Sequence, residues 1–151
     1  MQLAHYLGLL HAAQRRLGDA FRDVGGSHRA EVDVFHTCTR LAEQCDTHVE
    51  RLAPFVSRYG EHADDEPERL HSAIFQGPRE GGLGLLRDLQ DLYLMAAEAD
   101  LAWTVIGQAA QGVRDRDLLH VVEECERETA MQLKWTRSRM KEAAPQALVV
   151  A

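Results

Sequence analysis

The chain has 151 residues, which predicts a single domain, and a formal net charge of −7. That acidic balance argues against a nucleic-acid surface and an electrostatic membrane anchor, because both need clustered positive charge. The longest uncharged stretch, residues 101–113, is too short to span a bilayer, and the first residues lack the pattern of a signal peptide. The three cysteines form no CxxC pair and indicate buried thiols in a reducing compartment. We therefore expect a cytoplasmic protein without a membrane or nucleic-acid partner.

Apolar residues repeat at alternating steps of three and four over residues 3–24, which predicts an amphipathic helix. Gln14 interrupts this apolar seam. The pair Gly25-Gly26, followed by Ser27, is expected to end the helix, because glycine readily takes the left-handed conformation of a helix cap. The seam consists of Leu3, Leu7, Leu10, Gln14, Leu17, Phe21 and Val24.

A second helix is expected over residues 31–59, with Cys38, Cys45 and His48 on or beside its apolar seam. Pro54 lies inside it and predicts a kink, because proline donates no backbone hydrogen bond. Residues 60–82 hold most of the turn-forming residues and predict a long connection with one short amphipathic helix at 68–76.

The third helix is expected over residues 83–111 and the fourth over 117–142, with Pro145 stopping the latter and an apolar tail at 145–151. Strand patterns are nearly absent, so the fold class is all-α. The short first and last connections make two antiparallel hairpins. The long middle connection is able to run back along the molecule, which makes helices two and three parallel. Residues 1–144 thus predict a four-helix bundle with one crossover.

Polar residues interrupt the apolar seams at matching heights in all four predicted helices. Gln14 breaks the first seam, His48 lies beside the second, and Glu98 falls between Leu94 and Leu101 in the third. If the chain folds back at the turn near residues 113–114, residue 98 comes level with Glu128 and Gln132 in the fourth helix. The sequence therefore predicts a buried polar layer in the middle of the bundle, with a contact between Glu98 and His48.

The order of helices and this polar layer resemble the ferritin-like superfamily. In its metal-binding members, two helices each give a Glu and two each give Glu-x-x-His to a di-iron centre. On this chain the corresponding positions read Gln14, Cys45-x-x-His48, Glu98 and Thr129-x-x-Gln132, with Glu128 one residue away. Only His48 and Glu98 match, so the resemblance implies a degenerate site without ferroxidase activity.

Two interpretations of the layer stay open. In the first, the polar groups satisfy one another's hydrogen bonds, the chain has no cofactor, and it acts through association. In the second, His48, Glu98 and Glu128 bind iron or manganese in an atypical site of a metal-dependent oxidoreductase or metal-handling protein. Whether the chain is an enzyme is left undecided.

A homodimer is the expected assembly, because the third helix is apolar around most of its circumference and one bundle seam covers only part of that surface. The residues concerned are Leu92, Tyr93, Leu94, Met95, Ala97, Leu101, Trp103, Val105 and Ile106.

Overall fold

A computed structural model describes residues 2–60 and 74–150, and within these ranges the chain is all-helical, without strands. Four long helices lie side by side: α1 (Gln2–Ser27), α2 (Val32–Tyr59), α3 (Gly81–Gly112) and α4 (Arg116–Pro145). The all-α prediction is confirmed. Every predicted long helix is present, and the predicted boundaries differ from these by only a few residues.

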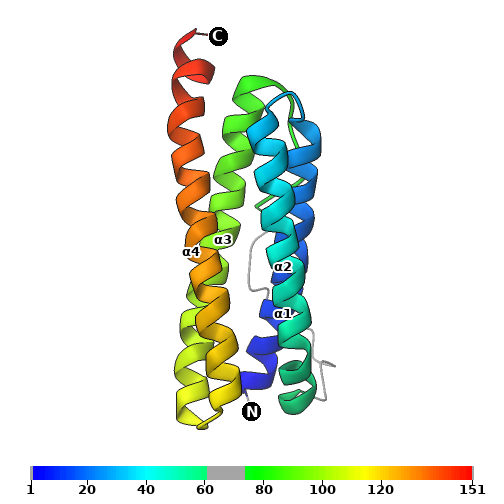
Figure 1. The fold of residues 1–151 in the computed structure, drawn as a ribbon, viewed down its shortest axis with the longest axis vertical. Coiled ribbons are helices and arrows are strands. Elements are labelled where there is room, and N and C mark those ends of the chain that lie inside the picture. The colour runs from blue at the N-terminus through cyan, green and yellow to red at the C-terminus, as the bar shows by residue number, and fades with distance from the viewer. Residues whose placement is uncertain (1, 61–73, 151) are drawn as a thin grey trace.

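The bundle is built from two helical hairpins, α1 with α2 and α3 with α4 (Figure 1). The Ser27 hydroxyl at the end of α1 donates to the carbonyl oxygen of Arg79, just before α3, over 2.7 Å. At the other end, the Arg58 guanidinium of α2 donates to Asp115 in the α3–α4 turn over 2.8 Å. Therefore α3 begins at the end where α1 meets α2, and α2 and α3 run in the same direction.

The predicted crossover and its short helix at 68–76 fall largely on residues 61–73, which lie outside the described residues. Where the structure describes this connection, at 74–80, the backbone is irregular rather than helical. Phe75 packs against the hydrophobic core at the α1–α2 end.

The glycines near the end of α1 have a different role from the predicted one. The helix continues through Gly25 and Gly26 to Ser27, and neither glycine takes a positive φ. A β-carbon at Gly25 would lie 3.0 Å from Cβ of Cys38, and one at Gly18 would lie 3.2 Å from Cβ of Cys45. These glycines therefore allow α1 and α2 to approach closely, a packing requirement that the capping interpretation missed.

The C-terminal prediction needs a smaller correction. Pro145 is the last residue of α4, but the chain does not leave the helical path there, because residues Gln146–Val150 form a short π-helix. This segment extends past the end of the bundle (Figure 1). Within the described ranges, the structure contains no helix of the length and apolarity needed to cross a membrane.

The hydrophobic core is divided into two clusters along the bundle axis. One cluster, near the α1–α2 turn, includes Phe21 and Leu89, and the other, near the α3–α4 turn, includes Leu7 and Trp103. The buried polar side chains Gln14 and His48 lie at heights between the two clusters. The predicted interruption of the apolar seams is therefore a real division of the core.

Candidate functional site

The middle of the bundle holds a layer of polar side chains from three helices. Gln14 comes from α1, His48 from α2, and Thr129 and Gln132 from α4, and all four are almost completely buried. We call Gln14, His48, Glu128, Thr129 and Gln132 the central polar layer. The sequence predicted that Gln14, His48 and Gln132 point inward, and the structure places them there.

His48 connects α1 to α4 through its two ring nitrogens. Nδ1 lies 2.9 Å from Oε1 of Gln14, and Nε2 lies 3.4 Å from Oε1 of Glu128. Both partner oxygens accept hydrogen bonds, and the neutral imidazole ring carries only one N–H. Either tautomer therefore donates to one of these two oxygens and leaves the other ring nitrogen facing an acceptor.

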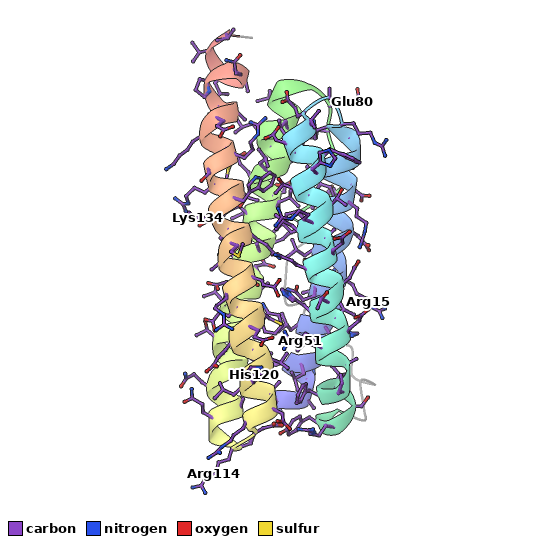
Figure 2. The ribbon with its side chains drawn as sticks, in the orientation of Figure 1. Arg15, Arg51, Glu80, Arg114, His120 and Lys134 are labelled. Atoms are coloured by element: carbon purple, nitrogen blue, oxygen red, sulfur yellow. The ribbon has the colours of Figure 1, made fainter. Side chains whose placement is uncertain are left out.

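The pKa of His48 is lowered from its ordinary value of 6.5, chiefly because burial removes the charged ring from water. Glu128 opposes this shift through its charge and its hydrogen bond, while the positive charge of Arg51 adds to it. Figure 2 shows Arg51 on α2, and its guanidinium forms an ion pair with Glu124 of α4. The neutral ring described above is therefore the favoured form near neutral pH.

Trp103 is a member of this region that sequence reasoning placed only in the apolar part of the third helix. Its indole N–H donates to Oγ1 of Thr129 over 3.0 Å, and that hydroxyl donates to the carbonyl of Cys125 over 2.8 Å. The His48 ring stands edge-on to Trp103, with centroids 5.6 Å apart. Trp103 thus fixes Thr129 and shields one side of the imidazole from water.

The hydrogen bonding of the central polar layer is incomplete. Gln132 Nε2 donates to Oε1 of Gln44 over 3.2 Å and lies 3.8 Å from the sulfur of Cys45. Among the described residues, however, Nε2 of Gln14 and Oε1 of Gln132 are buried without a hydrogen-bond partner. One unpartnered donor and one unpartnered acceptor therefore occur in the same layer, each at a cost of about 1–3 kcal/mol.

Glu98 is less deeply buried than the sequence predicted. The side chain is half-buried on α3, and its predicted neighbours Leu94 and Leu101 are exposed. The inward face of α3 is instead formed by Leu92, Ala96, Ala99 and Trp103. Because α3 is apolar on several faces, periodicity alone did not identify which face packs inward. His48 hydrogen-bonds with Gln14 and Glu128, and the contact between Glu98 and His48 stays a prediction.

A di-iron centre does not fit the residues of this layer. Such a centre needs several carboxylates and imidazoles, whereas this layer offers one imidazole, one carboxylate and neutral amides or hydroxyls. Across residues 2–60 and 74–150, no group of three or more His, Cys, Asp or Glu side chains is arranged to hold a metal ion. The metal role predicted for His48, Glu98 and Glu128 stays a prediction.

The three cysteines are all buried and unpaired. Burial is the main cause that raises the pKa of Cys38, Cys45 and Cys125 to about 12 in each case. A thiol with so high a pKa carries almost no thiolate at neutral pH, so none of the three is suited to act as a nucleophile.

The ends of the bundle hold polar clusters that sequence reasoning missed. At the α1–α2 end, the buried carboxylate of Asp88 accepts from the backbone N–H of Arg79 over 2.9 Å and from its guanidinium over 2.8 Å. Nε2 of His28 lies 2.8 Å from the same carboxylate. The signal in the sequence was a lone Asp88 within a leucine-rich run, but its histidine partner lies 60 residues away in the chain.

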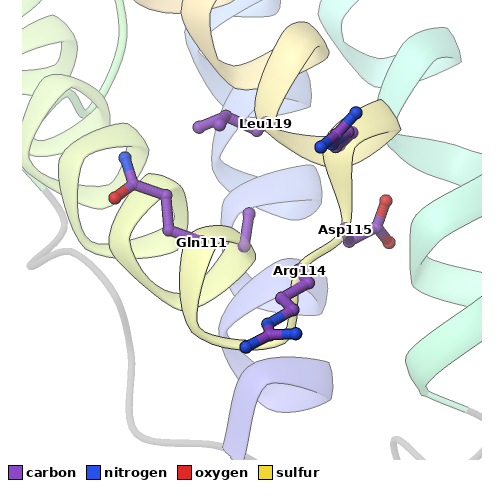
Figure 3. A pocket seen from close by; sticks show the side chains of 6 residues that line it. Gln111, Arg114, Asp115 and Leu119 are labelled. Atoms are coloured by element: carbon purple, nitrogen blue, oxygen red, sulfur yellow. The ribbon is translucent and has the colours of Figure 1, made fainter.

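The α3–α4 turn closes the other end (Figure 3). Arg114 takes a left-handed conformation with φ 59°, and the N–H of Asp115 bonds to the carbonyl of Ala110 over 2.9 Å, as in a Schellman cap. Asp115 then caps α4 by accepting from the N–H of Leu118, and it also accepts from the Tyr59 hydroxyl over 2.6 Å. A surface pocket of about 250 Å³ lies beside this turn, lined by Gln111 and Leu119.

Burial by itself would raise the pKa of the Asp115 carboxyl, but the hydrogen bonds from Tyr59, Leu118 and Arg58 outweigh it, and the pKa is lowered. Asp115 is therefore ionised at neutral pH and already bound by its neighbours. The turn and its pocket are consistent with a structural role.

Comparisons with known proteins give no relative to guide the interpretation: no family model, no curated protein and no solved structure matches this chain.

Proposed function

We propose that this chain is a ferritin-like helical-bundle protein that lacks ferroxidase activity and acts through self-association as a homodimer. The ferritin-like part of the proposal is supported by the parallel direction of α2 and α3, which a crossover through the connection at 60–82 would explain. The lack of ferroxidase activity is supported by the donor set of the central polar layer. The proposal keeps a cytoplasmic location, where the buried thiols stay reduced.

The observation that carries the association is the outer surface of α3. Leu94, Leu101 and Val105 are 49%, 68% and 50% exposed. The most apolar of the four helices therefore leaves large apolar side chains on the surface of the single chain. Burying the exposed part of one such side chain contributes roughly 1 kcal/mol, so covering several of them favours a stable contact. A second copy of the chain supplies the same surface and therefore a matching partner.

Two matched variants test the association. Leu101→Gln removes an apolar side chain from the outer face of α3, and Leu148→Gln removes one of nearly equal exposure, 65%, from the C-terminal segment. Light scattering over a range of concentrations should show that Leu101→Gln weakens the dimer at least tenfold while Leu148→Gln leaves it intact. A wild-type protein that stays monomeric at tens of micromolar would overturn the proposal.

The second candidate is a metal-handling protein or metal-dependent oxidoreductase with iron or manganese at an atypical site. One observation favours it: Nε2 of His48 lies 3.4 Å from Oε1 of Glu128, and a neutral imidazole and a carboxylate are a suitable pair of ligands for one cation. Glu98, from the adjacent helix, is the third residue predicted for this site.

Melting curves of chelator-treated protein, with and without added Fe²⁺, Mn²⁺ or Zn²⁺, distinguish the two candidates. A ligand that binds only the folded state raises the melting temperature. If the second candidate holds, one of these ions raises it in the wild type, and His48→Gln and Glu128→Gln each abolish that rise. The leading proposal expects no large shift with any of the three.

A further inference from the structure

A line of exposed side chains runs along one face of α3 at helical spacing. We call it the outer stripe, and its large apolar members are Leu83, Leu94, Leu101 and Val105, each about half exposed or more. Polar residues separate them along the same line: Arg87, Gln90 and Gln108 are exposed, and Glu98 is half-buried. The four apolar residues are spread over most of the helix, and Leu94 lies midway between Leu83 and Val105.

We infer that two copies of this chain pair through the outer stripe, with the two α3 helices antiparallel and a two-fold axis passing at Leu94. This inference rests on the proposed self-association. It specifies which surface forms the interface, the relative direction of the two α3 helices and the residue that lies at the two-fold axis. A two-fold contact brings the same patch of both copies together, so the stripe must be complementary to itself.

The register centred on Leu94 matches the apolar side chains of the two copies. Leu94 meets the partner's Leu94 at the axis. Leu83 then lies opposite the partner's Val105, and the same contact is repeated on the other side of the axis. Leu101 lies opposite the partner's Arg87, whose aliphatic stem covers apolar surface while its charged end stays in water.

Charge favours the same register. Arg87 comes within one helical turn of the partner's Glu98, on the same side of the interface, so two pairs of opposite charge flank the axis. A register centred near residue 98 would place Glu98 against the partner's Glu98. A centre at Leu101 would carry Leu83 beyond the end of the partner's α3.

A parallel arrangement is disfavoured for the same reason. It would place Arg87 level with the partner's Arg87 and Glu98 level with the partner's Glu98, so every charge on the stripe would face a like charge. The antiparallel pairing is the arrangement in which both the apolar and the charged members of the stripe find complementary neighbours.

Disulfide cross-linking tests the register. In Leu94→Cys protein, the two introduced thiols meet at the axis, so mild oxidation should give a covalent dimer within minutes. In Leu101→Cys protein, the two thiols lie about 20 Å apart along the helix direction and should not link. The native cysteines do not interfere, because all three are buried. A mixture of Leu101→Cys and Arg87→Cys chains should link across copies.

The outcomes separate this inference from the proposal beneath it. Efficient linking of Leu101→Cys with itself, alone or together with Leu94→Cys, would overturn the antiparallel register centred on Leu94. A dimer by light scattering in which neither variant links would also overturn it, while leaving self-association in place. A wild-type monomer would instead contradict the proposed function.

Discussion

Two histidine–carboxylate contacts in this bundle, one buried and one partly buried, differ in how completely their hydrogen bonds are satisfied. At the α1–α2 end, both oxygens of Asp88 are occupied by His28 and by the backbone and guanidinium of Arg79. In the central polar layer, the neutral His48 ring donates to only one of its two acceptors, and Gln14 and Gln132 each keep one buried atom without a partner among the described residues. The Asp88 cluster, in which both carboxylate oxygens are hydrogen-bonded, is typical of a structural role. The central polar layer keeps donors and acceptors that a ligand would be able to bind.

The largest difference should appear when a carboxylate is removed from the saturated cluster. Asp88→Ala leaves His28 and Arg79 without their shared partner, and it should lower the free energy of unfolding by about 3–5 kcal/mol in urea titrations. Asp91→Ala is the matched control, because Asp91 also accepts from Arg79, over 3.0 Å, but is partly exposed. Its loss should cost about 1 kcal/mol or less. An equal loss of unfolding free energy in Asp88→Ala and Asp91→Ala would contradict the special role given to the buried carboxylate.

Acid should weaken the central polar layer through His48. Its pKa is lowered in the folded state, so the unfolded chain binds more protons once the pH falls below about 6.5. Stability therefore falls as the pH falls from 6.5 toward the folded-state pKa, by at most about 1.4 kcal/mol per pH unit. In His48→Gln this part of the pH dependence should vanish. Identical slopes of stability against pH in both proteins would show that His48 is not the titrating group.

The smallest effect should come from Gln132, whose amide oxygen has no partner among the described residues. Gln132→Met keeps a long, flexible side chain and removes a buried acceptor without a partner, so the free energy of unfolding should change by less than about 1 kcal/mol. Thr129→Val, one turn earlier on α4, leaves the indole N–H of Trp103 without its acceptor. That change should cost about 1–3 kcal/mol. A large loss in Gln132→Met would mean that this amide is structurally required.

The predictable part of the molecule is the part encoded by local periodicity. The seams of α1, α2 and α4 carry one apolar face each, so Gln14, His48 and Gln132 stood out as interruptions and were placed correctly. The seam of α3 was not readable in this way, because the helix offers several apolar faces, and Glu98 was therefore placed between leucines that turn out to be exposed.

The end clusters were not predictable from local pattern. His28 and Asp88 are far apart in sequence, and neither belongs to a sequence motif that would predict their contact. The left-handed cap shows the same limit, because the turn places Arg114 where glycine is usually preferred. Such contacts depend on how the two hairpins meet, which single-helix periodicity does not contain.

The most direct test of the central claim is the mass of the native protein by sedimentation equilibrium between about 1 and 100 micromolar. The chain has a mass of 17.0 kDa. The account predicts a species of twice that mass that dominates at the upper concentrations and dissociates on dilution. A single species with the mass of one chain throughout this range would contradict it.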